Sequence, residues 1–176
     1  MEQLAGVSKE RIALIGSMTA QRAAAARLLG GTAPVAGSGS GPTGDTAAAL
    51  LKAFRAAVYG FEIVVTQASA ADRRSAAGTL SGLRTRSAEL QRLAGSAAGP
   101  RPLGYALPFA VSTPTAAGKL ATHVMTGLRD AVAGQLPAVA GDAAGLAGTV
   151  GSLADVCVQA ASWRVPLTAF PGLSST

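Results

Sequence analysis

The chain has 176 residues, of which 49% are hydrophobic and 14% charged, so it is long enough to bury a core and too apolar to be disordered throughout. A single cysteine, Cys157, excludes an internal disulfide, and a single histidine, His123, excludes a multi-histidine metal site. The net charge of +6 favours either acidic partners or, more simply, solubility.

The first 42 residues have the composition of an appendage. A weakly amphipathic helix is predicted within residues 1–29, but its apolar positions keep no single stripe. Gly, Ser and Pro dominate residues 30–42, as in a flexible linker. We therefore predict a flexible or partly helical appendage over residues 1–42, outside the core, and one domain over residues 43–176.

Neither an export signal nor a membrane span is predicted. The apolar run from Ile12 to Gly16 is shorter than the roughly 7–15 residues of an export signal, and Glu10 precedes it. No uncharged stretch gives the roughly 20 suitable apolar residues of a membrane span. We expect a cytoplasmic protein without a membrane span.

Two predicted helices open the domain. The first begins near Asp45 or Thr46 and places large apolar residues at every third or fourth position until about Ser69. Ser69 and Asp72 form a capping box for the second, which Gly95 and the following Gly-Pro pair end.

Two further helices follow a long connection. Thr113 and Pro114 are suited to the N-cap and first turn of the third helix, which Pro137 closes. The fourth helix begins near Asp142 and ends near Trp163.

The connections predict the topology. Short links make the first two helices antiparallel neighbours, and likewise the last two. The Pro-rich link over residues 97–112 reaches about 50 Å when extended, whereas a helix of about 24 residues is only about 36 Å long. We therefore predict an all-α, ferritin-like four-helix bundle with one long crossover between helices two and three.

Three segments carry a resemblance to a known family: residues 54–60 (FRAAVYG), residues 105–109 (YALPF), and the tail from Trp163 to Leu173. Together they resemble an actinobacterial ferritin-like domain family of unknown function, over residues 46–173. The family's Glu-His pair is replaced by Phe54 and Arg55, its second-helix histidine falls at Leu83, and its third-helix glutamate falls near Met125. The resemblance implies a degenerate member without the expected metal ligands.

The residues themselves also disfavour a metal site. A di-iron centre needs Glu-x-x-His pairs, and the sequence has none. Glu62 is the one acid that borders an apolar helix face. We predict no metal, no cofactor and no catalytic residue. His123 is expected to be a partly buried histidine with a hydrogen-bond partner, and Cys157 a small buried hydrophobe.

A polar strip on the first helix is the one candidate pocket edge. It consists of Arg55, Tyr59 and Glu62. One interpretation is an Arg55–Glu62 ion pair beside a solvent-facing Tyr59. The other is the remnant of a metal pocket, in which the guanidinium replaces the charge of the metal.

The tail is predicted to be a structural element. Pro166 and Pro171 prevent a helix, so the tail gains stability only by docking. We expect it to pack against residues 105–109, with Trp163 largely buried. The predicted structural anchors are Tyr105, Pro108, Phe109, Trp163 and Phe170.

Three functions are compatible with these features. The favoured one is a non-catalytic scaffold or interaction module that acts with an unknown protein partner or as a homo-oligomer, so that an enzyme is the less favoured class. The first alternative is a metal-dependent oxidoreductase or metal-handling protein whose site is completed by a partner or a dimer. The second is non-specific nucleic-acid binding through the arginines of the second helix, Arg73, Arg74, Arg84, Arg86 and Arg92.

Overall fold

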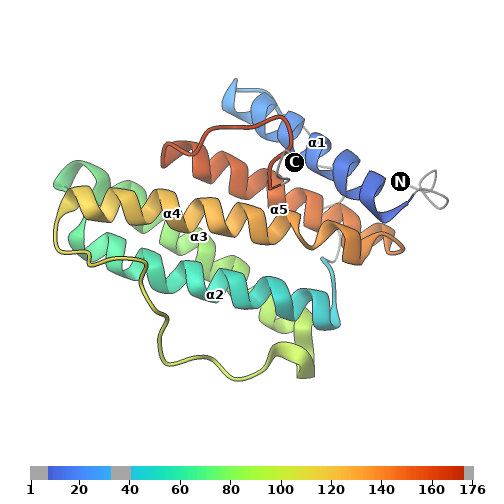
Figure 1. Cartoon of the computed structure of the whole chain (residues 1–176), viewed down its shortest axis with the longest axis horizontal. Helices are drawn as coiled ribbons and strands as arrows, with labels where there is room; N and C mark the ends of the chain where they lie inside the picture. Colours follow the sequence, from blue (N-terminus) through green and yellow to red (C-terminus); the bar gives the residue numbers. More distant parts are fainter. Residues whose placement is uncertain (1–7, 33–40, 173–176) are drawn as a thin grey trace.

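The computed structural model describes residues 8–32 and 41–172, and the regular secondary structure of these ranges is entirely helical. The helices in chain order are α1 (Lys9–Leu28), α2 (Gly44–Gln67), α3 (Ala70–Ala94), η2 (Gly95–Ala98), α4 (Pro114–Ala133), η3 (Leu136–Val139) and α5 (Ala143–Ser162). The prediction of an all-α chain is confirmed, and Figure 1 shows the helices lying side by side.

Side-chain caps begin three of the helices where the sequence predicts. The Ser69 hydroxyl accepts a hydrogen bond from the backbone N–H of Asp72 at 3.2 Å and donates one to the Asp72 carboxylate at 2.7 Å. Thr113 caps α4 ahead of Pro114, and Asp142 caps α5. Each cap satisfies a backbone N–H that has no partner within its helix.

Helices α2–α5 enclose the main part of the core. α2 packs against both α3 and α4, and α4 packs against α5, whereas α3 and α5 make the sparsest contact of these neighbouring pairs. Residues 99–113 connect η2 to α4 along the outside of α2 (Figure 1). The side between α3 and α5 is therefore the most loosely closed.

Helix α1 corrects the expectation that the first 42 residues stay outside the core. It lies against α5, and one of its faces is buried. The buried apolar side chains of this face are Ile12, Ala13, Ala20, Ala23 and Ala24. The sequence did not reveal this face because alanines form no stripe of large residues, yet small side chains let two helices approach closely. Residues 33–40 of the predicted linker lie outside the described residues, and the division into two segments stays a prediction.

The tail is docked, but not where the sequence predicted. Trp163 is only 7% exposed, as expected. Beyond it, Arg129 of α4 donates a hydrogen bond to the Pro166 carbonyl at 3.5 Å, and Ser17 of α1 donates one to the Pro171 carbonyl at 2.9 Å. The tail therefore runs over α4 and α1.

The connection that was expected to receive the tail lies against α2 instead. The rings of Tyr105 and Tyr59 are 5.6 Å apart, and Figure 1 shows the connection and the tail on opposite sides. The prediction that they pack together is wrong, because α1, assumed to lie outside the core, forms part of the groove that the tail occupies. Phe109 and Phe170, two predicted anchors, are 38% and 41% exposed, and Pro108 is exposed as well.

Helix α5 is the one described helix that is long and apolar enough to cross a membrane, with a mean hydropathy of 1.2 over its most apolar window. In the structure 67% of that window is buried inside the protein. A core helix passes the same test, so α5 gives only weak evidence for a membrane span.

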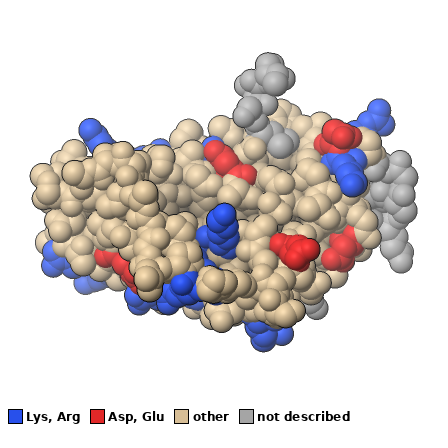
Figure 2. Space-filling model, turned by 60° about the horizontal axis from the view of Figure 1, so that its bottom comes forward, with Lys and Arg blue, Asp and Glu red and all other residues tan. Residues whose placement is uncertain are grey.

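The charges on one face of the molecule are visible in Figure 2. Charged side chains of both signs occur on this face with uncharged areas between many of them, and several Lys and Arg side chains follow its lower edge. Several arginines of α3 have local partners: Arg84 pairs with Glu62, Arg86 pairs with Glu89, and Arg73 donates to the Ala68 carbonyl. The net charge of +6 therefore does not form one basic patch on this face.

Candidate functional site at the seam between α3 and α5

The predicted polar strip on α2 does not come together as one pocket edge. The Arg55 guanidinium donates to the carbonyl oxygens of Ala98 at 3.2 Å, Gly99 at 3.4 Å and Pro100 at 3.3 Å. These carbonyls follow α3, where the helix dipole places partial negative charge. Arg55 thus holds the end of the α3–η2 segment against α2.

The other two members of the strip have different neighbours. Glu62 accepts a hydrogen bond from Arg84 of α3 at 2.8 Å, so it pairs with Arg84 where the sequence suggested Arg55. Tyr59 lies against Tyr105, and both rings line a groove of about 340 Å³ between α2, α4 and the long connection. Arg55, Tyr59 and Glu62 therefore act as separate contacts.

The single histidine and the single cysteine lie in contrasting environments. His123 of α4 is exposed and lines the same groove, so the expectation of a partly buried histidine is wrong. Cys157 is 3% exposed, as predicted. Burial raises the pKa of its thiol to about 11, chiefly because the thiolate would lose its hydration. Cys157 is therefore a protonated thiol near neutral pH, and the thiol is the less nucleophilic form.

Two polar bridges set the register of α3 against α5. The Trp163 indole N–H donates to the Thr79 hydroxyl at 3.1 Å, and the Arg86 guanidinium donates to the Ser152 hydroxyl at 2.5 Å. The two helices run antiparallel, because Thr79, early in α3, meets Trp163 directly after the end of α5, whereas Arg86, later in α3, meets Ser152 within α5. The Phe61 ring lies edge-on to Trp163 at 5.4 Å and closes one end of the seam.

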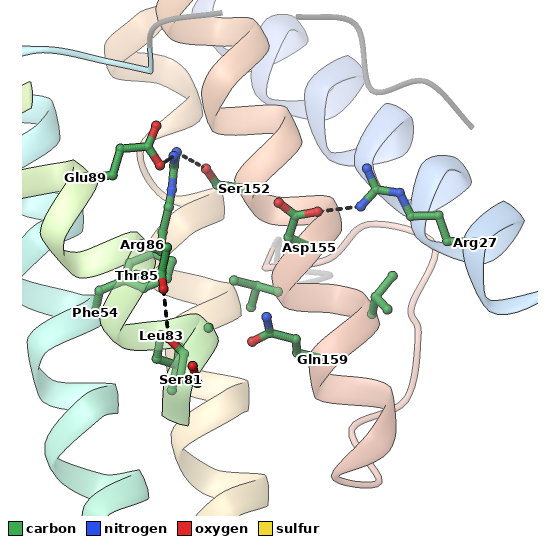
Figure 3. Close-up of a pocket in the computed structure, with 13 residues that line it drawn as sticks. Arg27, Phe54, Ser81, Leu83, Thr85, Arg86, Glu89, Ser152, Asp155 and Gln159 are labelled. Atoms are coloured by element: carbon green, nitrogen blue, oxygen red, sulfur yellow. Dashed lines mark hydrogen bonds and ion pairs between the residues drawn. The ribbon is translucent and has the colours of Figure 1, made fainter. Parts of the chain in front are cut away.

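A cavity of about 400 Å³ lies along the seam between these bridges (Figure 3). Its apolar lining includes Phe54 from α2, Leu83 from α3 and Val156 from α5. Charged and neutral polar side chains share the remaining wall with the backbone at Gly82: Arg27, Arg86, Glu89, Asp155, Ser81, Thr85, Ser152 and Gln159. The cavity therefore combines an apolar floor with a rim of both signs of charge.

Arg86 is the charged residue that reaches furthest inward. Its side chain is 23% exposed, and besides Ser152 it binds the Glu89 carboxylate at 2.5 Å. Its Nε–H is buried and has no hydrogen-bond partner among the described residues. Sequence reasoning grouped Arg86 with the other arginines of this helix. Its spacing of three residues from Leu83 and four from Leu90 already placed it on the apolar face.

Gly82 makes room for the opposite wall of the cavity. A Cβ atom at this position would lie 3.3 Å from Nε2 of Gln159, so a side chain here would crowd that amide. The Gln159 Oε1 atom is buried without a hydrogen-bond partner in the described part of the chain. A buried polar atom without a partner costs free energy, so this wall is better suited to a polar occupant than to dense packing.

Arg27 of α1 completes the outer rim. It forms an ion pair with Asp155 of α5, and Figure 3 shows the two side chains meeting across the space between their helices. The side chains are 31% and 62% exposed, respectively. The rim thus receives charged groups from three helices.

Comparison with known proteins places this cavity within one family. A family model described as a domain of unknown function, DUF4439, matches residues 46–175. The chain belongs to the DUF4439 family. No curated protein and no solved structure matches the chain significantly.

The DUF4439 domain includes α3–α5, the tail as far as residue 175, and most of α2. It contains every residue that lines the cavity except Arg27. The site is therefore built by the domain itself, and α1 adds one charged group at its edge.

No cluster of three or more His, Cys, Asp or Glu side chains suited to a metal ion occurs in the described part of the DUF4439 domain. The resemblance puts the family's ligand positions at Phe54, Arg55, Leu83 and Met125; Arg55 is half-buried, and the other three are 3%, 1% and 0% exposed. Phe54 and Leu83 both line the cavity. The three buried members of this set, Phe54, Leu83 and Met125, are therefore apolar.

Proposed function

We propose that this DUF4439 protein is a non-catalytic four-helix bundle of the ferritin-like type, acting as a scaffold or interaction module. The observation that carries the proposal is the chemistry of the interior. Of the four positions at which the resemblance places metal ligands, Phe54, Leu83 and Met125 are apolar and nearly fully buried, and the fourth is Arg55.

The donor chemistry of these residues is unsuited to a di-iron centre. Phe54 and Leu83 offer no donor atom, and the thioether of Met125 is a soft ligand, whereas iron sites of this type use carboxylate oxygen and imidazole nitrogen.

The arrangement of the helices supports the ferritin-like part of the proposal. Helices α2–α5 pack side by side, and the one long connection joins the second of them to the third. This is the connectivity of bundles with a single crossover.

Metal analysis tests the proposal directly. The full chain would be expressed in medium supplemented with iron and manganese, purified without chelators, and examined by elemental analysis and low-temperature EPR. We expect far less than one ion per chain, and a di-iron protein purified in parallel serves as the positive control. Stoichiometric, redox-active metal would refute a non-catalytic bundle and favour a metal-dependent function.

Nucleic-acid binding is the less supported alternative, because the arginines of α3 are partly engaged by acids and carbonyls and the charges in Figure 2 are mixed. A gel-shift titration at low and physiological salt distinguishes it, since binding through phosphates weakens steeply with salt. We expect no shift at physiological salt.

A further inference from the structure

We propose that the cavity between α3 and α5 binds a small zwitterion with an apolar side chain, such as a free apolar amino acid or a very short peptide. The proposal rests on the proposed function, since it names the ligand of a non-catalytic binding module.

The charges of the rim fit a dipolar ligand better than a simple ion. Two guanidinium groups, Arg27 and Arg86, and two carboxylates, Glu89 and Asp155, line the cavity. The charges of these four groups sum to zero. A ligand with only one sign of charge is therefore attracted by two of the groups and repelled by the other two. A ligand carrying both an ammonium and a carboxylate group can place each one beside its opposite.

Arg86 is suited to receive the carboxylate. Its Nη1 donates to Glu89 and its Nη2 donates to Ser152, and each of these nitrogens carries a second N–H. A guanidinium carries further N–H donors beyond these, in a planar fork that matches a carboxylate. Ser152, already held by Arg86, lies on the same wall.

Asp155 is suited to receive the ammonium group. Its partner in the structure is Arg27. The Asp155 side chain is 62% exposed and the Arg27 side chain is 31% exposed. Exposed ion pairs contribute little to stability, so exchanging this partner for a ligand ammonium group costs little. The released Arg27 remains on the rim and compensates the charge of the ligand carboxylate.

The floor and the size of the cavity determine the rest of the ligand. Phe54, Leu83 and Val156 present apolar surface to the cavity, and an aliphatic or aromatic side chain placed against them leaves water. The volume of about 400 Å³ lies near the lower end of small-molecule sites, about 300–1,000 Å³. This volume suits an amino acid or a very short peptide and is too small for a folded partner.

A set of probes with one carbon skeleton tests the charge requirement. L-leucine and L-leucyl-L-leucine carry both charges, 4-methylpentanoate carries only the carboxylate, and 3-methylbutylamine carries only the ammonium group. Binding to the full chain would be measured by calorimetry and by chemical-shift perturbation. We expect at least one of the two zwitterions to bind about tenfold or more tightly than either singly charged probe. Tighter binding of L-leucine would indicate a free amino acid as the ligand, and tighter binding of L-leucyl-L-leucine would indicate a short peptide.

Three variants locate the site. Asp155→Asn and Arg86→Gln each remove one predicted contact and should weaken zwitterion binding about tenfold or more, which corresponds to one charged contact. Arg84→Gln is the matched control, since Arg84 also lies on α3 and forms an ion pair but does not line the cavity. It should leave binding unchanged. Asp155→Glu should restore part of the affinity that Asp155→Asn loses.

The outcomes separate this inference from the proposed function. If no probe binds, if singly charged probes bind as tightly as zwitterions, or if Asp155→Asn binds like the parent, the inference is refuted. Asp155 is exposed, so its variant tests the site even if Arg86→Gln fails to fold by circular dichroism. Metal content is measured on the same preparation. Metal-free protein that binds no probe refutes only the ligand assignment, whereas stoichiometric metal refutes the proposed function.

Discussion

Gly60 of α2 allows a close approach between α2 and α4, and adding a single methyl group there tests the packing. A Cβ atom at Gly60 would lie 2.7 Å from Cγ2 of Val124, against about 3.5–4.0 Å for carbon atoms in ordinary contact. Val124 cannot easily turn away, because a valine in a helix has one strongly preferred χ1 rotamer. In Gly60→Ala the helices must therefore move apart.

Two opposing effects determine how much Gly60→Ala changes the free energy of unfolding. Overpacking costs about 1–3 kcal/mol, and replacing glycine by alanine within a helix stabilises it by about 0.5–1 kcal/mol. We expect Gly60→Ala to lower the free energy of unfolding by about 0.5–2 kcal/mol. At this chain length each kcal/mol changes Tm by about 2–4 °C, so the melting temperature should fall by a few degrees.

A matched glycine and a double variant make the test specific. A Cβ atom added at Gly78 of α3 would have no other atom within 4 Å, so Gly78→Ala should raise the unfolding free energy by about 0.5–1 kcal/mol. Combining Gly60→Ala with Val124→Ala should cost about 1 kcal/mol less than the sum of the single variants, because the clash is gone. Urea and thermal unfolding measure the parent and each variant. A Gly60→Ala protein as stable as the parent, beside a stabilised Gly78→Ala, would show that α2 and α4 do not approach this closely.

Three further predictions concern single contacts. Burial raises the Cys157 pKa from 9.0 to about 11, so the thiol of the unfolded chain ionises at a lower pH than that of the folded protein. The free energy of unfolding should therefore fall as the pH rises from 9 to 11. Cys157→Ala should lose less stability over this range, as measured by urea unfolding at several pH values. Arg55→Gln removes charged hydrogen bonds to three carbonyls and should destabilise the protein by about 1–2 kcal/mol. Arg84→Gln breaks one exposed ion pair and should cost less than about 1 kcal/mol. Equal effects of the two variants in urea unfolding would contradict the role given to Arg55. Deleting the chain from Pro166 onward removes the buried Pro171 and its bond to Ser17, so Tm should fall and limited proteolysis should cut α1 sooner; unchanged Tm and cleavage would mean that the tail does not hold α1.

The helices of the domain could be predicted because their signals are local. The caps at Ser69, Thr113 and Asp142 each act within one turn, and the apolar stripes of α2–α5 depend only on spacing. Helix α1 and the course of the tail were not predictable in the same way. The packing face of α1 is mostly alanine, and the groove for the tail exists only once α1 is in place.

In the candidate site, too, the local positions could be predicted from the sequence, but the packing between helices could not. Arg86 stands at a core-facing position of its helix, so the sequence already marked it as an exception among the arginines. The cavity beside it depends on the register that brings Gly82 opposite Gln159, and nothing along either helix alone reports that register. Arg55 was predicted to face Glu62 on its own helix, but carbonyl groups beyond the end of α3 offer it several acceptors at once.

The packing of α1 on α5 also has a consequence for synthesis on the ribosome. Translation produces α1 first, but the surfaces that cover it, α5, η3 and the Pro171 carbonyl, are made more than one hundred residues later. Domains generally begin to fold while the chain is still emerging. Helices α2, α3 and α4 can associate during that time, whereas the buried face of α1 must wait for its partner. We therefore expect α1 and the tail to pack onto each other after α2, α3 and α4 have associated.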